Sequence, residues 1–421
     1  MPSGLMPTMR RVLTPAARTV RRSVLPRVFP SRSHRWPDPV RRLRVVGLLS
    51  SASGLGKSAR LCMAVLARAG YGVSGADVAS LYDSDDGLPF GGTAGAAGRA
   101  DVSIYHLNPP MLLPGIIRSN PMRFWQGYNI GYWAWELEAL PREWIEAIRF
   151  MDAIMVPSSF CKAAVERHTG KPVLVVPHPV AIGAKAAVPS AERSAAGRFR
   201  VVSIFNFGSS FERKNPLAAI AAFRQAFGDD ETAELVLKVG DGSRYRADRD
   251  RLREAIGTAA NIRLVDEVWD EARLDDFLGA ADACLSLHRS EGFGLTLAEA
   301  IAKGVPVVAT NWSGNVDFCR PDLCFPVDYR LVPARDEHLS FQGMEDAVWA
   351  EPSVDHAAAQ LRRVRDNSGE ARGAAARLRG HLRDYLAGAT YQAALATLAA
   401  DGAGASRPLP AHPEPAAGAG R

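Results

Sequence analysis

The sequence lacks the long apolar runs and the paired cysteines that would mark a membrane span or a disulfide framework. No stretch approaches the roughly 18 apolar residues that a bilayer-crossing helix needs. The five cysteines are scattered and include no C-x-x-C pair, which favours reduced thiols in a cytosolic protein over disulfides or a zinc site. Hydrophobic residues make up 47% and charged residues 23% of the 421 positions. These proportions exclude a wholly disordered chain and predict a globular protein. A length of 421 residues predicts two domains.

The chain also lacks a net positive charge outside its N-terminal segment. Residues 1–42 hold ten arginines and a single acid, Asp38. Taking these out of the totals of 51 basic and 45 acidic residues leaves 41 against 44, so the remaining chain is nearly neutral. An enzyme of nucleic acids usually carries its positive charge on the folded surface. The charge distribution therefore argues against a nucleic-acid partner.

The segment 1–42 is predicted to be a basic tail. Within residues 10–25, apolar side chains recur on one face of a helical pattern beside arginines. Such a helix can lie on an anionic membrane surface, and a disordered leader or a transit peptide is the alternative. The expected location is the cytoplasm, with peripheral contact to the cytoplasmic membrane face as a hypothesis.

Short apolar runs alternate with helical patterns along the rest of the chain. Helical patterns are expected at Ser58–Arg68 and Pro216–Phe227. The strand candidates are Arg44–Leu49, Val102–His106, Ile130–Trp133, Ala153–Pro157, Val173–Val176, Val201–Phe205, Leu235–Val239, Ile262–Val265, Ala283–Leu287 and Pro306–Ala309. Alternation of buried strands with helices predicts parallel sheets covered by helices on both faces.

This alternation falls into two halves of the same kind. An Ala/Ser/Arg-rich stretch around residues 183–197 separates them. We therefore predict an α/β protein with two Rossmann-like domains, 43–185 and 198–370, facing a cleft at the carboxyl ends of their strands. Helices over 371–400 are expected to pack back on the first domain, and 401–421 to be an unstructured tail.

One segment of the second half combines two glutamates with a glycine-rich loop. Glu291 and Glu299 are spaced E-x7-E, with Gly292 and Gly294 between them. The first glutamate follows a predicted strand, and a helix is expected to begin near Leu295. The glycines let backbone amides approach a ligand, and the helix start presents free N–H groups to a phosphate. Glu299 is placed to accept hydrogen bonds from a ribose diol, although a surface glutamate pair on an amphipathic helix remains the alternative.

With this segment the sequence resembles glycosyltransferase family 4 and its relatives, the retaining two-domain GT-B enzymes. The resemblance covers roughly residues 44–390. It implies that Glu291 contacts the transferred sugar and that Glu299 contacts the nucleotide ribose. The loop between them would supply amides to the sugar and diphosphate of the donor. These loop residues are Gly292, Phe293, Gly294, Leu295 and Thr296.

A second motif, Phe211–Pro216, lies between the first strand of the second half and its helix. A lysine at a helix start in the cleft can neutralise a leaving diphosphate, and the resemblance gives Lys214 this role. The family usually has a partner arginine five residues earlier, where this chain has Ser209. Arg213 is the candidate substitute. The alternative is a solvated helix start with two like charges.

Two further loops belong to the expected cleft. Ser313-Gly314-Asn315 replaces the usual pair of glycines in the late loop of the family, and it is assigned no contacts. In the first half, Gly54-Leu55-Gly56 forms the glycine-rich turn that the resemblance places near the donor diphosphate and the acceptor. The same stretch, Ser51–Ser58, matches the P-loop motif G-x-x-x-x-G-K-S/T at every defined position except the first, where Ser51 replaces the glycine.

Three residues after strands of the first half are candidates for the acceptor side. His106 ends one strand and reaches the cleft from there, unless it is a structural histidine. Trp135 and Glu136 follow another strand, where many family members carry a histidine. An aromatic face suits a sugar ring, so Trp135 with Glu136 would form an acceptor platform, with core packing of the tryptophan as the alternative.

The interpretation is a retaining glycosyltransferase that moves a hexosyl group from a nucleotide-diphosphate sugar to a glycan or lipid-linked acceptor, in cell-surface polysaccharide biosynthesis. No metal and no other cofactor is expected, because the predicted cleft loops hold no obvious Asp-x-Asp, and Asp83-Ser-Asp85 lies in a glycine-rich, surface-like stretch. The alternatives are a P-loop phosphotransferase, which would use Lys57 with ATP and magnesium, and a non-catalytic GT-B scaffold.

Overall fold

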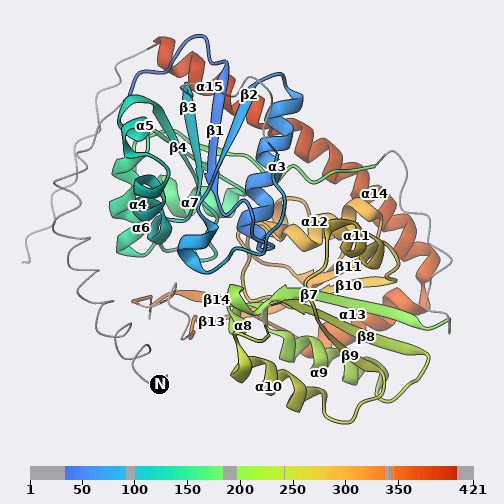
Figure 1. The fold of residues 1–421 in the computed structure, drawn as a ribbon. Coiled ribbons are helices and arrows are strands. Elements are labelled where there is room, and N and C mark those ends of the chain that lie inside the picture. Colours follow the sequence, from blue (N-terminus) through green and yellow to red (C-terminus); the bar gives the residue numbers. More distant parts are fainter. Residues whose placement is uncertain are drawn as a thin grey trace, which may run out of the picture.

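The computed structural model describes residues 34–91, 100–183, 197–240, 242–336, 341, 343–344 and 346–404. The predicted amphipathic segment 10–25, most of the linker and the tail beyond residue 404 lie outside this range. Two α/β domains stand one above the other in Figure 1, with the C-terminal helices running along one side of both.

The first domain contains a six-stranded parallel sheet in the order β2-β1-β3-β4-β5-β6. Its strands are β1 (Arg42–Gly47), β2 (Gly72–Asp77), β3 (Val102–His106), β4 (Tyr128–Tyr132), β5 (Ala153–Val156) and β6 (Val173–Val175). Its α-helices are α3 (Gly54–Arg68), α4 (Pro109–Arg118), α5 (Pro121–Gln126), α6 (Arg142–Ala147) and α7 (Ser159–Glu166). Sequence patterns missed β2, because Gly72 and Gly75 interrupt its apolar pattern.

The second domain repeats this plan in the order β12-β11-β10-β7-β8-β9, again parallel. Its strands are β7 (Phe199–Asn206), β8 (Ala233–Gly240), β9 (Ile262–Asp266), β10 (Ala283–Ser286), β11 (Val307–Thr310) and β12 (Phe325–Val327). Its helices are α8 (Phe211–Lys214), α9 (Pro216–Phe227), α10 (Arg246–Ile256), α11 (Glu271–Gly279), α12 (Leu295–Lys303) and α13 (Val354–Asp366). The predicted fold class is confirmed.

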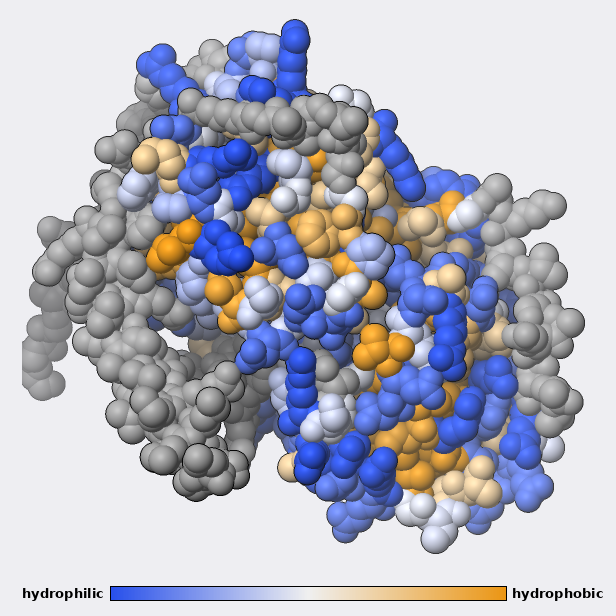
Figure 2. Space-filling view, viewed as in Figure 1, coloured by the Kyte–Doolittle hydropathy of each residue, from blue (hydrophilic) through white to orange (hydrophobic). Residues whose placement is uncertain are grey.

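Apolar side chains cover both faces of each sheet. In the first domain, Val46 and Tyr105 belong to one buried cluster and their neighbours Val45 and Ile104 to another. Successive residues of a strand point to opposite faces, so each cluster lies between the sheet and one helix layer. The second domain has the same arrangement. In Figure 2, hydrophilic side chains cover most of the face that is not grey, and hydrophobic ones form smaller areas among them.

An antiparallel hairpin extends from the second domain to the first. It consists of β13 (Tyr329–Pro333) and β14 (Val348–Pro352). Phe341 and Trp349 from this part of the chain join the buried cluster of the first domain that contains Trp135 and Trp144. In Figure 1 the hairpin projects beneath α4 and α6. The two domains therefore share one apolar cluster.

The C-terminal helices divide between the domains. The first, α14 (Ser368–Gly388), packs against α12 of the second domain through Leu378 and Leu382. The second, α15 (Tyr391–Gly404), packs against α3 of the first domain. The expectation that all of 371–400 packs on the first domain is therefore wrong for α14. The expected tail from residue 401 also starts too early, because α15 continues to Gly404. Within the described part of the chain, no helix is long and apolar enough to span a membrane.

Candidate active site

Loops at the carboxyl ends of the two sheets meet and touch. Ser158, before α7, donates a hydrogen bond of 2.6 Å from its hydroxyl to the carbonyl of Gly292. The amide of Ser159 donates to the carboxylate of Asp317 at 2.7 Å. These bonds hold the loops after β10 and β11 against the first domain. The loop that carries Glu291 therefore lies at the interface between the domains.

Glu291 lies at this interface between two cations. It follows β10 and is only 9% exposed. Its Oε1 forms an ion pair with the ammonium of Lys214, the last residue of α8, and its Oε2 lies 3.4 Å from Nη1 of Arg213. Burial by itself raises the pKa of Glu291, but the charges of Lys214 and Arg213 outweigh burial and lower the pKa to about 2. The carboxylate is therefore ionised and held by charge from the same domain.

Arg213 points into the site and is not part of a solvated helix start. Its guanidinium is buried and donates to the carbonyls of Ser290 and Ser209, each at 2.8 Å. Arg213 therefore brings a guanidinium next to Ser209, where the family usually has its arginine. Its Nη2 lies 3.4 Å from Glu136 of the first domain. Burial lowers the pKa of Arg213, but Glu136 and Glu291 outweigh it and hold the pKa above its ordinary value.

Two buried N–H groups, on the residues before and after Lys214, are left without partners among the described residues. Among the described residues, neither Nε of Arg213 nor the side-chain nitrogen of Asn215 has a hydrogen-bond acceptor. Buried donors without an acceptor are costly and therefore rare. A ligand that supplies acceptor oxygens here would satisfy them.

The late loop Ser313-Gly314-Asn315 fixes the backbone of Glu291. The hydroxyl of Ser313 accepts a hydrogen bond of 2.8 Å from the Glu291 amide, and the Gly314 amide donates to the Glu291 carbonyl at 2.9 Å. A Cβ at Gly314 would lie 2.2 Å from the carbonyl oxygen of Gly292, so only glycine fits this close approach. The loop thus has a supporting role that its sequence did not reveal.

The predicted donor loop forms the turn into α12. Gly294 has a φ of +90°, a left-handed conformation that favours glycine, and it caps the helix that begins with Leu295 and Thr296. The first N–H groups of such a helix have no partner within the helix. The side chain of Phe293 packs in the core against His178 and Phe318. Phe293 therefore offers the cleft its backbone and not its ring.

Glu299, inside α12, has a partner from the opposite domain. Its side chain is largely buried and forms an ion pair with the ammonium of Lys57 in the first turn of α3. Gly54, Leu55 and Gly56 also belong to this first turn, so they are helix and not the free turn that was predicted. A Cβ at Gly56 would lie 2.4 Å from the carbonyl oxygen of Ser51. Gly56 therefore lets the helix start pack on the preceding loop.

The structure buries two of the three candidates for the acceptor side, His106 and Trp135. His106 is fully buried and stacks on Tyr132 with ring centres 4.3 Å apart. Its Nδ1 lies 3.1 Å from the hydroxyl of Ser58. Burial lowers the pKa of His106 to about 3, so the ring is neutral at physiological pH. The expectation that His106 reaches the cleft is wrong for this structure.

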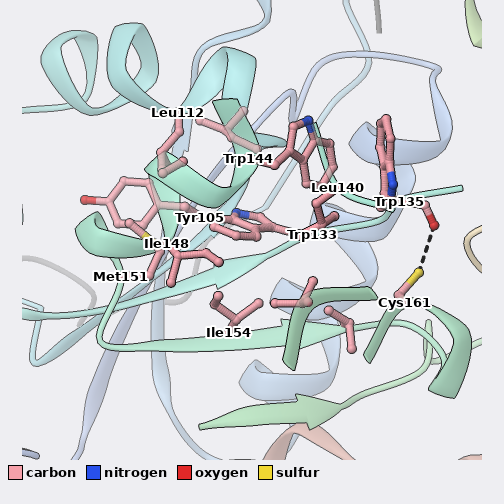
Figure 3. Close-up of a cluster of buried hydrophobic side chains, with 14 of the residues drawn as sticks. Tyr105, Leu112, Trp133, Trp135, Leu140, Trp144, Ile148, Met151, Ile154 and Cys161 are labelled. Carbon is pink, nitrogen blue, oxygen red and sulfur yellow. Dashed lines mark hydrogen bonds between the residues drawn. The ribbon is translucent and has the colours of Figure 1, made fainter. Parts of the chain in front are cut away.

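Trp135 belongs to the apolar core. It is 1% exposed, its ring centre lies 4.6 Å from that of Trp144, and its indole N–H donates to the carbonyl of Ala139 at 2.8 Å. Figure 3 shows it among buried tryptophans, with its backbone carbonyl accepting from the thiol of Cys161. An aromatic acceptor platform at Trp135 is therefore excluded by packing. Glu136 alone turns toward the cations, through Arg213.

Three contributors were not found from the sequence. Ser158 and Ser313 act through single hydrogen bonds to the loop around Glu291, and serine is too common to signal this. Ser313 also adopts a φ of +74°, which its residue type does not predict. His178, after β6, lies beside Phe293 and places Nδ1 3.1 Å from the hydroxyl of Tyr132. Across the described ranges, no three His, Cys, Asp or Glu side chains form a group that could hold a metal ion.

Comparison with known proteins identifies the family. The model of a family described as "Family 4 Glycosyltransferase in conflict systems" matches residues 159–398, which is more than half of the chain. The chain belongs to this glycosyltransferase family. The resemblance inferred from the motifs around Glu291 and Lys214 is thereby confirmed. No curated protein matches the sequence.

Solved structures support the fold of this glycosyltransferase. Anabaena HepE in complex with UDP-glucose has a TM-score of 0.58 at 13% identity, over 86% of this chain and 98% of that chain. A UDP-forming α,α-trehalose-phosphate synthase from Burkholderia xenovorans has a TM-score of 0.57 at 13% identity, over 86% and 99%. S. aureus TarM, in complex with UDP, gives 0.51 at 12% identity over 72% of this chain, which spans about half of TarM (55%). At these identities the likeness shows the GT-B fold.

Proposed function

We propose that this glycosyltransferase moves a hexosyl group from a nucleotide-diphosphate sugar to a glycan or lipid-linked acceptor, with retention of anomeric configuration. The observation that carries the proposal is Glu291 held between Lys214 and Arg213, one loop away from Glu299. The neighbours solved with UDP or UDP-glucose support a nucleoside diphosphate as the leaving group.

The cations supply the charge that the leaving group needs. When the bond to the sugar breaks, negative charge grows on the diphosphate, and cations already in place stabilise it without reorganisation. Lys214 and Arg213 are fixed at this point by their ion pairs with Glu291. Charge from these side chains takes the place of a metal ion in the proposed mechanism.

The two glutamates position the donor. Glu291, ionised by its neighbours, accepts hydrogen bonds from hydroxyls of the transferred sugar, and Glu299 accepts from the ribose. The acceptor enters from the first domain, where Glu136 faces Arg213 across a gap of 3.4 Å. The leaving diphosphate then helps to deprotonate the incoming hydroxyl on the same face of the sugar. The protein contributes mainly orientation and charge.

The structure favours this function over the P-loop alternative. In a P-loop, the residue at Ser58 would bind magnesium through its hydroxyl. Here Ser58 is fully buried and hydrogen-bonded to His106. A binding scaffold without activity would have no need for Lys214 and Glu291 in contact, so a catalytic role is favoured.

The acceptor class and location rest on the N-terminal segment. Its basic pattern over residues 10–25 suits an anionic membrane surface. We therefore propose a cytoplasmic enzyme with peripheral membrane contact that acts in cell-surface polysaccharide biosynthesis. Deletion of residues 1–33 is expected to abolish co-sedimentation with anionic liposomes, and unchanged co-sedimentation would contradict the membrane contact.

Donor turnover tests the proposed reaction. Proton NMR is used to follow UDP-glucose and the GDP, ADP and CDP sugars with wild-type protein, in the presence of glycan acceptors or of water alone. The product is expected to appear first as the anomer of the donor, and Glu291→Gln is expected to stop its formation. First appearance of the opposite anomer would contradict retention. Turnover of ATP in place of all four donors would contradict the function.

A further inference from the structure

Lys57 contacts the proposed donor site from the first domain, yet the proposed function gives it no role. It lies in the first turn of α3, within the stretch Ser51–Ser58 that resembles a P-loop. Its ammonium pairs with Glu299, which lies on α12 of the second domain. Lys57 is therefore a cation that the first domain brings against the glutamate of α12.

The cation of Lys57 is fully charged in this setting. Burial lowers its pKa, but Glu299, together with Glu271 and Asp275 of α11, outweighs burial and holds the pKa above its ordinary value. Its side chain is 16% exposed. A buried carboxylate such as Glu299 needs a partner when no ligand is bound, because an unpaired buried charge is costly. Lys57 supplies that partner.

The charges around Glu291, counted over both domains, are already balanced without a ligand. Arg213 and Lys214 carry two positive charges, and they face the two carboxylates of Glu291 and Glu136. A diphosphate adds at least two negative charges. Ribose hydroxyls that donate to Glu299 are neutral and release Lys57 from that carboxylate. The released ammonium then has an anion to bind only if the diphosphate lies within its reach.

We propose that Lys57 is a donor-binding residue supplied by the first domain: it caps Glu299 in the empty site and binds diphosphate oxygens once the ribose takes over that glutamate. This inference rests on the proposed function, since it requires a nucleoside diphosphate at Glu299. It adds a side chain to the loop that the resemblance already places near the donor diphosphate, and it makes donor binding depend on a charged group from each domain.

Calorimetry with UDP and ligand-observed NMR with uridine test this role. Lys57→Met is expected to weaken UDP binding about tenfold or more, because it removes a charge-assisted hydrogen bond. Uridine, which lacks phosphate, is expected to bind the variant as well as the wild type or better. The matched control is Lys162→Met, which removes a lysine of α7 whose side chain is 40% exposed. This control is expected to change neither affinity.

Three outcomes would overturn the inference. If Lys57→Met binds UDP as tightly as the wild type or more tightly, Lys57 only caps Glu299. If UDP and uridine lose affinity equally, Lys57 acts through the arrangement of the domains. In both cases the proposed function stands, because the wild type binds the nucleotide. If the wild type binds none of UDP, GDP, ADP and CDP, the proposed function fails and the inference fails with it.

Two further variants keep the test decisive if Lys57→Met does not fold. Lys57→Gln removes the charge but keeps a group that can donate to Glu299, and it is expected to show the same loss for UDP. Lys57→Arg keeps the charge and is expected to stay within about threefold of the wild type. Thermal melting of each variant is measured beside the binding curves.

Discussion

The two edges of the interface between the domains are built differently. On the second domain, four charged side chains face the site from α8, the loop after β10 and α12, namely Arg213, Lys214, Glu291 and Glu299. On the first domain, the corresponding positions are largely filled by buried packing, with Trp135 and His106 at 1% and 0% exposure. The comparison teaches that the charged residues of the candidate site are concentrated in one domain. The other domain supplies walls and two charges, Lys57 and Glu136.

The difference follows from what covers each edge. Trp135 is covered by Phe341 from the segment between β13 and β14, with ring centres 5.7 Å apart. The Nε2 of His106 lies 3.5 Å from the hydroxyl of Tyr391 on α15. Both covers come from more than 200 residues away in the sequence. The charged edge is held mainly by ion pairs within the second domain, and Lys57 and Glu136 contact it from the first domain.

The largest expected effect comes from Trp135→Ala, which tests whether this part of the first domain is a packed wall. Loss of a fully buried tryptophan is expected to lower the free energy of unfolding by about 3–5 kcal/mol, measured by urea denaturation. The control is Met122→Ala, because Met122 is 53% exposed. This change is expected to alter the free energy of unfolding little. A loss below about 1 kcal/mol with abolished transfer would instead indicate a sugar platform.

Glu291→Gln tests the charged edge. It removes the carboxylate that the cations hold, and the rate of donor turnover is expected to fall about 10²–10³-fold, as for loss of one positioned electrostatic group. Glu146→Gln on α6, whose partner is Arg142, is the control and is expected to keep full activity. The release of UDP from UDP-glucose, or of the nucleotide from the matching donor, is measured. Retention of more than a tenth of the rate would contradict a role for Glu291.

Acidification tests the buried histidines of the first domain. Burial lowers the pKa of His106 to about 3 and that of His178 to about 4. The unfolded chain therefore binds protons at these sites below pH 6.5 while the folded chain does not, so stability falls as the pH drops from 7 to 5. Each histidine is expected to cost about 2 kcal/mol over this range.

Urea denaturation at pH 7 and pH 5 measures this effect. Replacement of His106 by glutamine is expected to reduce the pH-dependent loss by the share of one histidine. An unchanged difference between the two pH values would show that His106 is accessible to protons in the folded protein.

The smallest effect is expected at the contact between the edges. The hydroxyl of Ser159 donates to Asp317 across the domains at an exposed position. Ser159→Ala keeps the backbone hydrogen bond to Asp317 and is expected to lower stability by about 0.5–1.5 kcal/mol, seen as a small decrease in melting temperature. A decrease equal to that of Trp135→Ala would show that this bond, and not apolar packing, joins the domains.

The sequence could predict the charged edge because its chemistry is local. Glu291, Glu299 and Lys214 lie within short segments whose order of strand, loop and helix determines where they point. Strand β3 (Val102–His106) and helix α9 (Pro216–Phe227) have the bounds that the sequence predicted. Periodic apolar patterns fix such elements.

The sequence could not predict the packed edge because its partners are distant. The sequence around Trp135 does not indicate that Phe341, about 200 residues later, covers this side chain. The ion pair of Lys57 with Glu299 likewise joins residues 242 positions apart. The positive φ of Ser313 is set by the Glu291 backbone that it supports. These features depend on how the domains meet.

The most direct test of the central claim is a thermal-shift comparison with UDP, GDP, ADP and CDP without metal, and with ATP and magnesium, on wild type and Glu299→Ala. A ligand at about 100 times its dissociation constant stabilises the native state by about 2.7 kcal/mol. One nucleoside diphosphate is expected to raise the melting temperature of the wild type and to have no effect on Glu299→Ala. Stabilisation by ATP with magnesium alone, equal in both proteins, would contradict a nucleotide-sugar site on the second domain.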